Sequence, residues 1–250
     1  LGSARLAIID LTADGHQPMA SDDGEVVLAF NGEIYNHREE RARLEAAGHR
    51  FRSHSDTEVI LALYLRDGAE FVRRLRGMFA FALYDRRGGP GRERLLLARD
   101  HFGIKPLIYV QSAAGISFAS EIKTLIAGRQ VSGAIDPVAL QQVLIRGSVR
   151  QPRTILAQAR MLPAAHMMTV DHTGTRIEPY WSLATDRVAG MRVRPYAEIR
   201  EAVHDVIVRS VEAQLIADVP VGAFLSGGID SSLLVALIAA RHSAPIQTYS

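Results

Sequence analysis

The chain has 250 residues, with 29 Lys and Arg against 27 Asp and Glu, and 48% of its residues are hydrophobic. This length and composition exclude a wholly disordered protein and favour two domains. A net charge of +2 is too small for a nucleic-acid or anionic-membrane footprint. Since no apolar run approaches the roughly 20 residues that cross a bilayer, we expect a cytoplasmic protein that binds neither nucleic acid nor membrane. Without cysteine, the residues shown contain no disulfide, thiolate metal site or cysteine nucleophile.

Strand and helix signals alternate along the first part of the chain. Short apolar runs predict strands over 26–30, 78–84, 95–98, 107–110 and 116–118. Asn36, three residues before Glu39, predicts the start of a helix over 38–45, and a capping box at 55–58 predicts a second helix. The apolar face of that second helix is built by Val59, Ile60, Leu63 and Tyr64. Several buried strands with helices around them fit two packed sheets covered by helices.

The end of the chain has the pattern of a parallel α/β unit. A helical segment begins near Tyr196 and ends at Asp218-Val219-Pro220. A strand over 221–225, a loop over 226–232, an apolar helix over 233–240 and a strand from 246 follow. This order is typical of the opening of a parallel sheet. Scattered prolines and short strand-like pieces precede this part, so we place the domain boundary between 151 and 195.

The loop over 226–232 has the residues of an anion site. Its two glycines let the backbone approach a ligand closely, its three serines can donate hydroxyls to phosphate oxygens, and a helix N-terminus follows. Asp230 would repel a bare phosphate, which suggests Mg²⁺ between this carboxylate and a polyphosphate. An ordinary Gly/Ser turn capped by Asp230 explains the same residues, and the spacing alone favours neither interpretation.

Polar residues of the first part stand where apolar ones would be expected. A free α-amino acid needs a bidentate cation for its carboxylate and carboxylates for its ammonium group, and Arg5, Glu33 and Asp56 supply both. Asn31 and Gly32 offer N–H donors for a developing oxyanion. Each residue also has an ordinary role: a surface ion pair for Arg5, a hairpin turn for Asn31-Gly32, and a first-turn helix acid for Asp56.

In chain order, eight segments resemble motifs of the asparagine synthetase family. They lie at residues 5–10, 15–19, 30–36, 55–58, 77–81, 99–107, 119–123 and 226–231. The last of them also looks like the pyrophosphate loop of ATP pyrophosphatases. The resemblance covers essentially the whole chain, and the ordered combination is much more specific than any single motif.

The resemblance implies an α/β protein in which residues 1–165 form a class II glutamine amidotransferase domain. That domain is an αββα sandwich of the N-terminal-nucleophile hydrolase type. Residues 166–195 would be a junction, and residues 196–250 the first unit of a parallel α/β ATP-pyrophosphatase domain, of the adenine nucleotide alpha hydrolase type. The implied activity is ATP-dependent synthesis of asparagine from aspartate through β-aspartyl-AMP, with ammonia released from glutamine and with Mg²⁺ beside ATP.

The resemblance also assigns roles to individual residues. Glutamine would be bound by Arg5, Leu6, Ile8, Asn31, Gly32, Glu33 and Asp56. Asn31 and Gly32 would form the oxyanion hole. ATP would be bound by Leu225, Ser226, Gly227, Gly228, Asp230, Ser231 and Ser232, with Mg²⁺ on Asp230. We expect the small molecules glutamine, aspartate and ATP as partners, and we leave a homodimer open.

The chain departs from the family pattern at both ends. Family members begin with Met-Cys-Gly, and the thiol of that cysteine is the nucleophile. The resemblance starts inside the first domain, so we expect a fragment whose nucleophile precedes Leu1 and whose remaining synthetase residues follow Ser250. Residues 1–250 alone should then catalyse neither half-reaction.

Two other functions stay open at this point. Sibling enzymes of the same architecture amidate other carboxylates or sugars, or close a β-lactam ring, and the residues that choose the acceptor would lie beyond Ser250. A non-catalytic remnant would bind glutamine without releasing ammonia.

Overall fold

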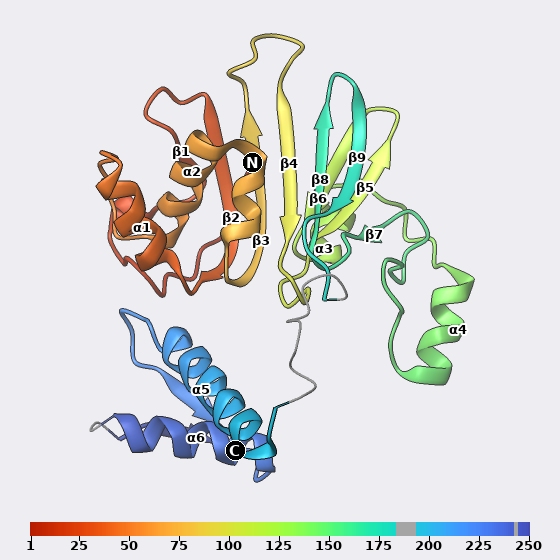
Figure 1. Ribbon diagram of the computed structural model, residues 1–250. Coiled ribbons are helices and arrows are strands. Elements are labelled where there is room, and N and C mark those ends of the chain that lie inside the picture. The colour runs from red at the N-terminus through yellow and green to blue at the C-terminus, as the bar shows by residue number, and fades with distance from the viewer. Residues whose placement is uncertain (184–193, 243–244) are drawn as a thin grey trace. The chain divides into compact units, whose positions relative to one another are not determined.

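A computed structural model describes residues 1–183, 194–242 and 245–250 (Figure 1). The chain divides into two compact units, each of which is described by itself. The first unit comprises Leu1–Arg5, His16–His49 and Asp56–Asp186. The second comprises Leu6–Gly15, Arg50–Ser55 and Arg187–Ser250.

The first unit is built on a six-stranded antiparallel sheet in the order β1-β2-β3-β4-β8-β9 (Figure 1). Its strands are β1 (Met19–Ala20), β2 (Val26–Ile34), β3 (Gly77–Asp85), β4 (Arg94–Arg99), β8 (His166–Asp171) and β9 (Gly174–Pro179). A second sheet has the order β6-β5-β7, with β5 at Ile108–Ser112, β6 at Gly115–Ala119 and β7 at Arg160–Met161. The strands predicted over 78–84, 95–98, 107–110 and 116–118 are thereby confirmed.

The two sheets pack face to face. Ala80 and Ala82 of β3 and Leu97 of β4 share one apolar cluster with Leu107, Leu162 and Met168, and Tyr109 and Phe118 of the second sheet pack against it. Alternate residues of β3 point the other way, because side chains alternate along a strand. On that opposite face the ring of Phe81 meets the ring of Phe71, which in turn meets Tyr64.

Helices cover both outer faces. Helix α1 (His37–Ala46) packs on α2 (Asp56–Asp67), α2 packs against β1 and β2, and the 3₁₀ helix η2 (Gly68–Arg74) follows α2. Helix α3 (Ile122–Ala127) covers the second sheet, where its Leu125 joins Ile108 and Val110 in a separate cluster. The resulting layer order, helices, sheet, sheet, helix, confirms the αββα arrangement. The sequence analysis missed α3 and α4 (Pro137–Arg146).

Strand β2 is longer than predicted. It continues to Ile34, and β3 pairs with all of it, from Val26 opposite Asp85 to Ile34 opposite Gly77. Asn31, Gly32 and Glu33 therefore lie inside a strand, and the hairpin turn considered for Asn31-Gly32 is wrong. A Cβ at Gly32 would overlap the Met78 carbonyl oxygen, so only glycine fits there.

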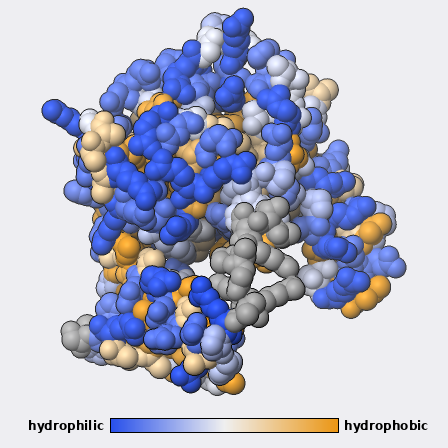
Figure 2. All heavy atoms as spheres, in the orientation of Figure 1, coloured by the Kyte–Doolittle hydropathy of each residue, from blue (hydrophilic) through white to orange (hydrophobic). Residues whose placement is uncertain are grey.

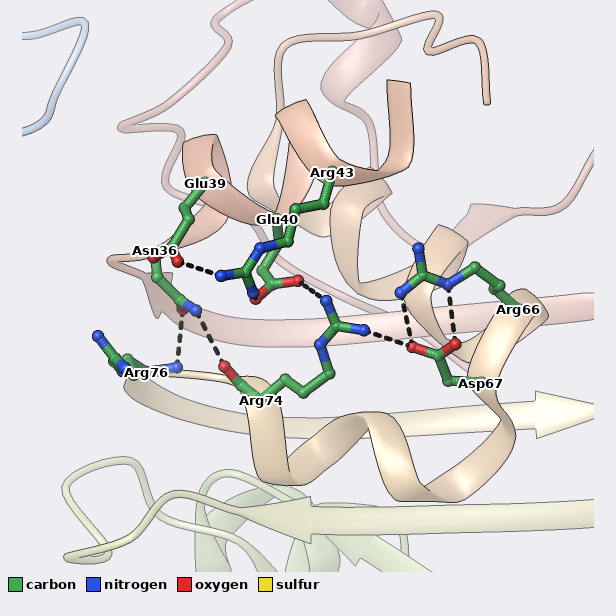
Figure 3. A network of polar contacts seen from close by, with 8 residues as sticks. All are labelled: Asn36, Glu39, Glu40, Arg43, Arg66, Asp67, Arg74 and Arg76. Atoms are coloured by element: carbon green, nitrogen blue, oxygen red, sulfur yellow. Dashed lines mark hydrogen bonds and ion pairs between the residues drawn. The ribbon is translucent and has the colours of Figure 1, made fainter. Parts of the chain in front are cut away.

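Asn36 has a different role from the helix cap that its spacing predicts. It precedes α1, but its side chain makes no capping hydrogen bond. Its Nδ2 donates to the Arg74 carbonyl oxygen at 2.9 Å, and its Oδ1 accepts from the Arg76 N–H at 2.8 Å (Figure 3). Arg74 also pairs with the buried carboxylate of Glu40. This network ties the exit of β2 to the segment that enters β3.

The second unit contains the predicted parallel element. Strands β10 (Gly222–Phe224) and β11 (Gln247–Tyr249) pair in parallel, and α6 (Ile229–Arg241) connects them. Helix α5 (Tyr196–Gln214) begins at the predicted residue and packs against α6. Helix α6 begins at Ile229, four residues before the predicted start, because residues 229–232 already form its first turn. The segments Ala13–Gly15 (the 3₁₀ helix η1) and Asp10 also belong to this unit.

The division at 166–195 stays a prediction. Residues 166–179 of this segment form β8 and β9 at one side of the larger sheet, and residues 184–193 lie outside the described part of the chain. Within residues 1–183, 194–242 and 245–250, no helix combines the length and apolar character needed to span a membrane.

The second unit presents large apolar side chains to solvent (Figure 2). Ile229 is 87% exposed, Phe224 is 85% exposed, and Leu233 and Leu234 are 44% and 42% exposed. Residues 1–250 expressed alone should therefore aggregate. Size-exclusion chromatography at rising concentration should show growing oligomers, and replacing Leu233 and Leu234 by Ser should reduce them. Leu1→Ser is the matched control at a singly exposed leucine, and a monodisperse wild-type monomer would contradict the expectation.

Candidate functional site

The site begins at one edge of β2. Strand β1 pairs with β2 only as far as Leu28, so over the next residues this edge carries no strand of the described chain. Backbone N–H groups alternate between the two edges of a strand. Phe30 and Ile34 direct theirs to this edge, where they donate to Gln17 Oε1 at 2.7 Å and Asp56 Oδ2 at 2.9 Å. The same alternation directs the Gly32 N–H to this edge, between the two.

Asp56 is a buried carboxylate at the start of α2. It is only 4% exposed, and burial raises its pKa to about 6, although hydrogen bonds from the backbone of Ile34 and Thr57 and the charge of Arg5 favour the ionised form. Burial also raises the pKa of Glu33, and the nearby Asp56 charge raises it further, while Lys105 lowers it. The two carboxylates therefore lie close enough to repel each other, which makes the place suitable for a ligand cation.

The structure brings together part of the predicted glutamine set. The charge of Arg5 acts on Asp56 and the charge of Asp56 acts on Glu33, and Asn31 and Gly32 precede Glu33 on β2. Arg5 is half-buried, and the exposed Asn31 approaches Ser120 Oγ at 3.5 Å through its Nδ2. Leu6, which is 88% exposed, and the half-buried Ile8 belong to the second unit, and their roles stay predictions.

Arg99 and Asp100, which lie in one of the family-like motifs but had no predicted role, are both buried. The Asp100 carboxylate is fully buried and accepts hydrogen bonds from the backbone N–H groups of Phe79, Phe102, Ile104 and Lys105 at 2.9–3.2 Å. The Arg99 guanidinium donates to the carbonyl oxygens of Lys105, Gly103 and Leu162 and to Gln151 Oε1. These bonds fix the loop that carries Lys105, whose charge acts on Glu33.

Lys105 itself is half-buried. The sequence signal for the Arg99-Asp100 pair is its place at the end of an apolar strand, where an unpaired charge is costly to bury. That signal indicates buried charged side chains with a structural role, but it does not identify Glu33 as the neighbour of Lys105.

The predicted phosphate loop connects β10 to α6. Gly227 has a φ of +77°, which favours glycine, and Gly228 occupies the N-cap position of α6. The hydroxyls of Ser226 and Ser231 lie 3.1 Å apart, and Ser231 Oγ donates to the Gly228 carbonyl oxygen at 3.2 Å. Asp230 lies in the first turn of the helix and is exposed, as is Ser232, whereas Leu225 is half-buried. This arrangement gathers hydroxyl and N–H donors at a helix N-terminus, where phosphate oxygens are favoured.

Two family models match the chain. Residues 1–181 match the family model described as glutamine amidotransferase domain, so the chain belongs to the glutamine amidotransferase family, in its class II form. Residues 202–250 match a second model, described as asparagine synthase.

Relatives with curated names match the whole length of the chain. Asparagine synthetase [glutamine-hydrolyzing] 3 of Bacillus subtilis is 37% identical over 257 residues, which cover 100% of this chain and 40% of that protein. Amidase chyE of Penicillium rubens is 35% identical, over 96% of this chain and 34% of that protein. The chain thus spans about two fifths or less of the length of these relatives.

Among solved structures, the glutamine phosphoribosylpyrophosphate amidotransferase of Bacillus subtilis is similar with a TM-score of 0.49 at 18% identity. The match covers 95% of this chain and 49% of that chain.

The raised pKa of Asp56 predicts a stability effect that depends on pH. The folded state favours protonated Asp56. The resulting stabilisation of the folded state is complete below pH 3.8, the ordinary pKa of aspartate, and is lost as the pH rises to about 6. Asp56→Asn is neutral at every pH and keeps an oxygen for the Ile34 N–H. In the full-length natural protein at pH 7, the free energy of unfolding of this variant should exceed that of the wild type by up to about 2–3 kcal/mol. Its thermal unfolding midpoint at pH 7 should therefore be higher than that of the wild type.

Asp85→Asn is the matched control with the opposite sign. Burial of Asp85 is outweighed by hydrogen bonds from Arg87 and Tyr64, which lower its pKa to about 2. Its stabilising contribution is present above pH 3.8 and is lost as the pH falls through about 2. This variant should therefore be less stable than the wild type at pH 7. An Asp56→Asn protein that is less stable than the wild type from pH 4 to pH 8 would contradict the electrostatic account.

Proposed function

We propose that the natural protein containing this chain makes asparagine from aspartate and ATP, with ammonia released from glutamine. The proposal depends most on the β2 edge, where Asp56 lies within electrostatic reach of both Arg5 and Glu33, and Glu33 follows Asn31 and Gly32 on β2. Membership of the glutamine amidotransferase family and the asparagine synthase match over 202–250 support the two halves of the reaction.

Glutamine binding would use both charges of the site. The Arg5 guanidinium can form a bidentate pair with the α-carboxylate of glutamine. Glu33 and Asp56 can accept hydrogen bonds from its α-ammonium group. The buried Asp56 and the half-buried Glu33 repel each other in the free protein, so an ammonium between them removes that repulsion and favours the ionised form of both. Affinity for an α-ammonium compound therefore follows from the same burial that raises the pKa of Asp56.

Amide cleavage would use the donors of β2. A thiol nucleophile adds to the carboxamide carbon of glutamine, and the carbonyl oxygen becomes an oxyanion that Gly32 N–H and Asn31 Nδ2 stabilise by hydrogen bonding. The carbon–nitrogen bond then breaks and ammonia leaves. Water hydrolyses the thioester, which yields glutamate and regenerates the thiol. The thiol is taken from the family resemblance, because these 250 residues contain no cysteine that could supply it.

The loop from Ser226 to Ser232 would hold the phosphates of the substrate ATP. Its glycines let the backbone approach, Ser226 and Ser231 supply hydroxyls that already lie 3.1 Å apart, and Leu225 would contact the nucleotide. Mg²⁺ would be shared between the phosphates and Asp230; this single carboxylate fits a metal bridged by substrate better than a cage of protein ligands. ATP would adenylate the β-carboxylate of aspartate with loss of pyrophosphate, and ammonia would displace AMP to form asparagine.

A sibling reaction with a different acceptor is the second candidate. Two relatives named amidases, chyE and chry2, are 35% and 34% identical to this chain, close to the 37% of the asparagine synthetase. Both candidates use the glutamine site in the same way and differ only in the molecule that receives ammonia. A homodimer and a cytoplasmic location stay predictions.

Two variants of the full-length natural protein should separate the two half-reactions. Asp56→Asn should lower glutamine-dependent asparagine formation at least about tenfold while formation from ammonium salts continues, because only the ammonium-binding carboxylate is lost. Ser226→Ala should lower formation from either nitrogen source, because it removes a phosphate donor, while glutamate release from glutamine continues. Asparagine, glutamate and pyrophosphate are measured in each reaction.

The products formed by the wild-type protein distinguish the candidate functions. Asparagine formed in proportion to pyrophosphate supports the first function. Pyrophosphate release only with another carboxylate would establish the sibling reaction in its place, and glutamine binding without glutamate release would establish the non-catalytic remnant.

A further inference from the structure

Gln17 connects two elements of the glutamine site. Its side chain is buried, with 5% of the residue exposed, and its Oε1 accepts the Phe30 N–H at 2.7 Å. Its Nε2 donates to Thr57 Oγ1 at 3.1 Å. A backbone N–H can only donate, so the oxygen of the carboxamide must face Phe30 and its nitrogen must face Thr57. One carboxamide therefore joins strand β2 to helix α2.

Both partners of Gln17 are sequence neighbours of site residues. Phe30 precedes Asn31, which begins the oxyanion pair, and Thr57 follows Asp56, the buried carboxylate. The second connection between these elements is the Asp56 carboxylate itself, which accepts the Ile34 N–H at 2.9 Å. Strand β2 is thus held against α2 on either side of Gly32, by a neutral carboxamide at Phe30 and by a charged group at Ile34.

The two connections differ in what a ligand does to them. The Asp56 carboxylate would also bind the ammonium group of glutamine, so its hydrogen bonds change when substrate arrives. The Gln17 carboxamide bonds to Phe30 and Thr57 within the protein and has no charge to titrate, so it can keep the spacing between strand and helix constant. The amide end of glutamine must reach the oxyanion donors on β2 while its ammonium end reaches Asp56 on α2, which requires a fixed spacing between the two elements. Small displacements of catalytic groups lower the rate of reaction strongly.

We propose that Gln17 is a positioning residue for glutamine hydrolysis. Its carboxamide sets the spacing between the oxyanion donors on β2 and the ammonium-binding Asp56 on α2. This inference rests on the proposed glutamine-hydrolysing function and adds a residue to it that contacts neither substrate nor nucleophile.

The test uses the full-length natural protein and three substitutions along this connection. Gln17→Met keeps the length of the side chain and removes both hydrogen bonds, so kcat for glutamine hydrolysis should fall and KM should rise, with kcat/KM lowered about tenfold to a hundredfold. Thr57→Val keeps the bond to Phe30 and removes the tie to α2, so KM should rise with little change in kcat. Thr57→Ser keeps the hydroxyl and should restore wild-type values of both constants.

Thr154→Val is the matched control for lost stability. Thr154 is 5% exposed, and its hydroxyl lies within hydrogen-bond distance of the Leu156 and Ala159 carbonyl oxygens. Leu156 and Ala159 belong to the cluster that α3 joins, on the far side of the second sheet. This variant should unfold at a lower temperature and keep kcat and KM for glutamine. Ammonia-dependent product formation should be unchanged in all four variants, because none of them alters the second unit.

The outcomes separate this inference from the proposed function. A Gln17→Met protein with wild-type kcat and KM would overturn the inference, as would losses that Thr154→Val reproduces at equal loss of stability. If Gln17→Met does not fold, unchanged KM in Thr57→Val overturns it instead. A wild-type protein that releases no glutamate from glutamine overturns the proposed function, whatever the variants show.

Discussion

The hydrogen bond between the Ile34 N–H and the buried Asp56 carboxylate fixes strand β2 against helix α2, and the rest of the candidate site depends on it. It leaves the open edge of β2 facing the start of the helix. Its acceptor is a carboxylate at a place where burial disfavours charge, which raises the pKa of Asp56 to about 6. A bond that stabilises the fold and a charge that destabilises it thus reside in one side chain. A ligand ammonium resolves this conflict, since it favours the charged form.

The surrounding structure keeps this charged place rigid. Asp100 and Arg99 hold the loop that carries Lys105, whose charge partly offsets the repulsion between Glu33 and Asp56. Asn36 and Glu40 tie the exit of β2 to the segment before β3 (Figure 3). The buried polar groups in these positions are satisfied by backbone and side-chain partners, so they specify one arrangement of strand, helix and loop. The apolar cores on both faces of the sheets hold the layers themselves together.

Apolar runs sufficed to predict strands β3 to β6 and the parallel unit of β10, α6 and β11, because burial dominates there. The end of β2 could not be predicted, since Asn31, Gly32 and Glu33 disfavour strands locally and only pairing with β3 extends it. The role of Asn36 was mistaken for a similar reason, because its partners are backbone groups of Arg74 and Arg76, which are distant in sequence. Arg5, Glu33 and Asp56 could be identified as candidates from the sequence, whereas the effects of Arg5 on Asp56 and of Asp56 on Glu33 required the structure.

Proton release on ligand binding tests the central claim about Asp56 most directly. Calorimetric titration of the full-length protein with an unreactive α-amino acid analogue of glutamine, in buffers of different ionisation enthalpy, counts the protons released. At pH 6 binding should release about half a proton, because Asp56 is about half protonated there, and the release should fall away by pH 8. Asp56→Asn should remove this release. Equal proton release at pH 6 and pH 8, or release that Asp56→Asn leaves unchanged, would contradict the account.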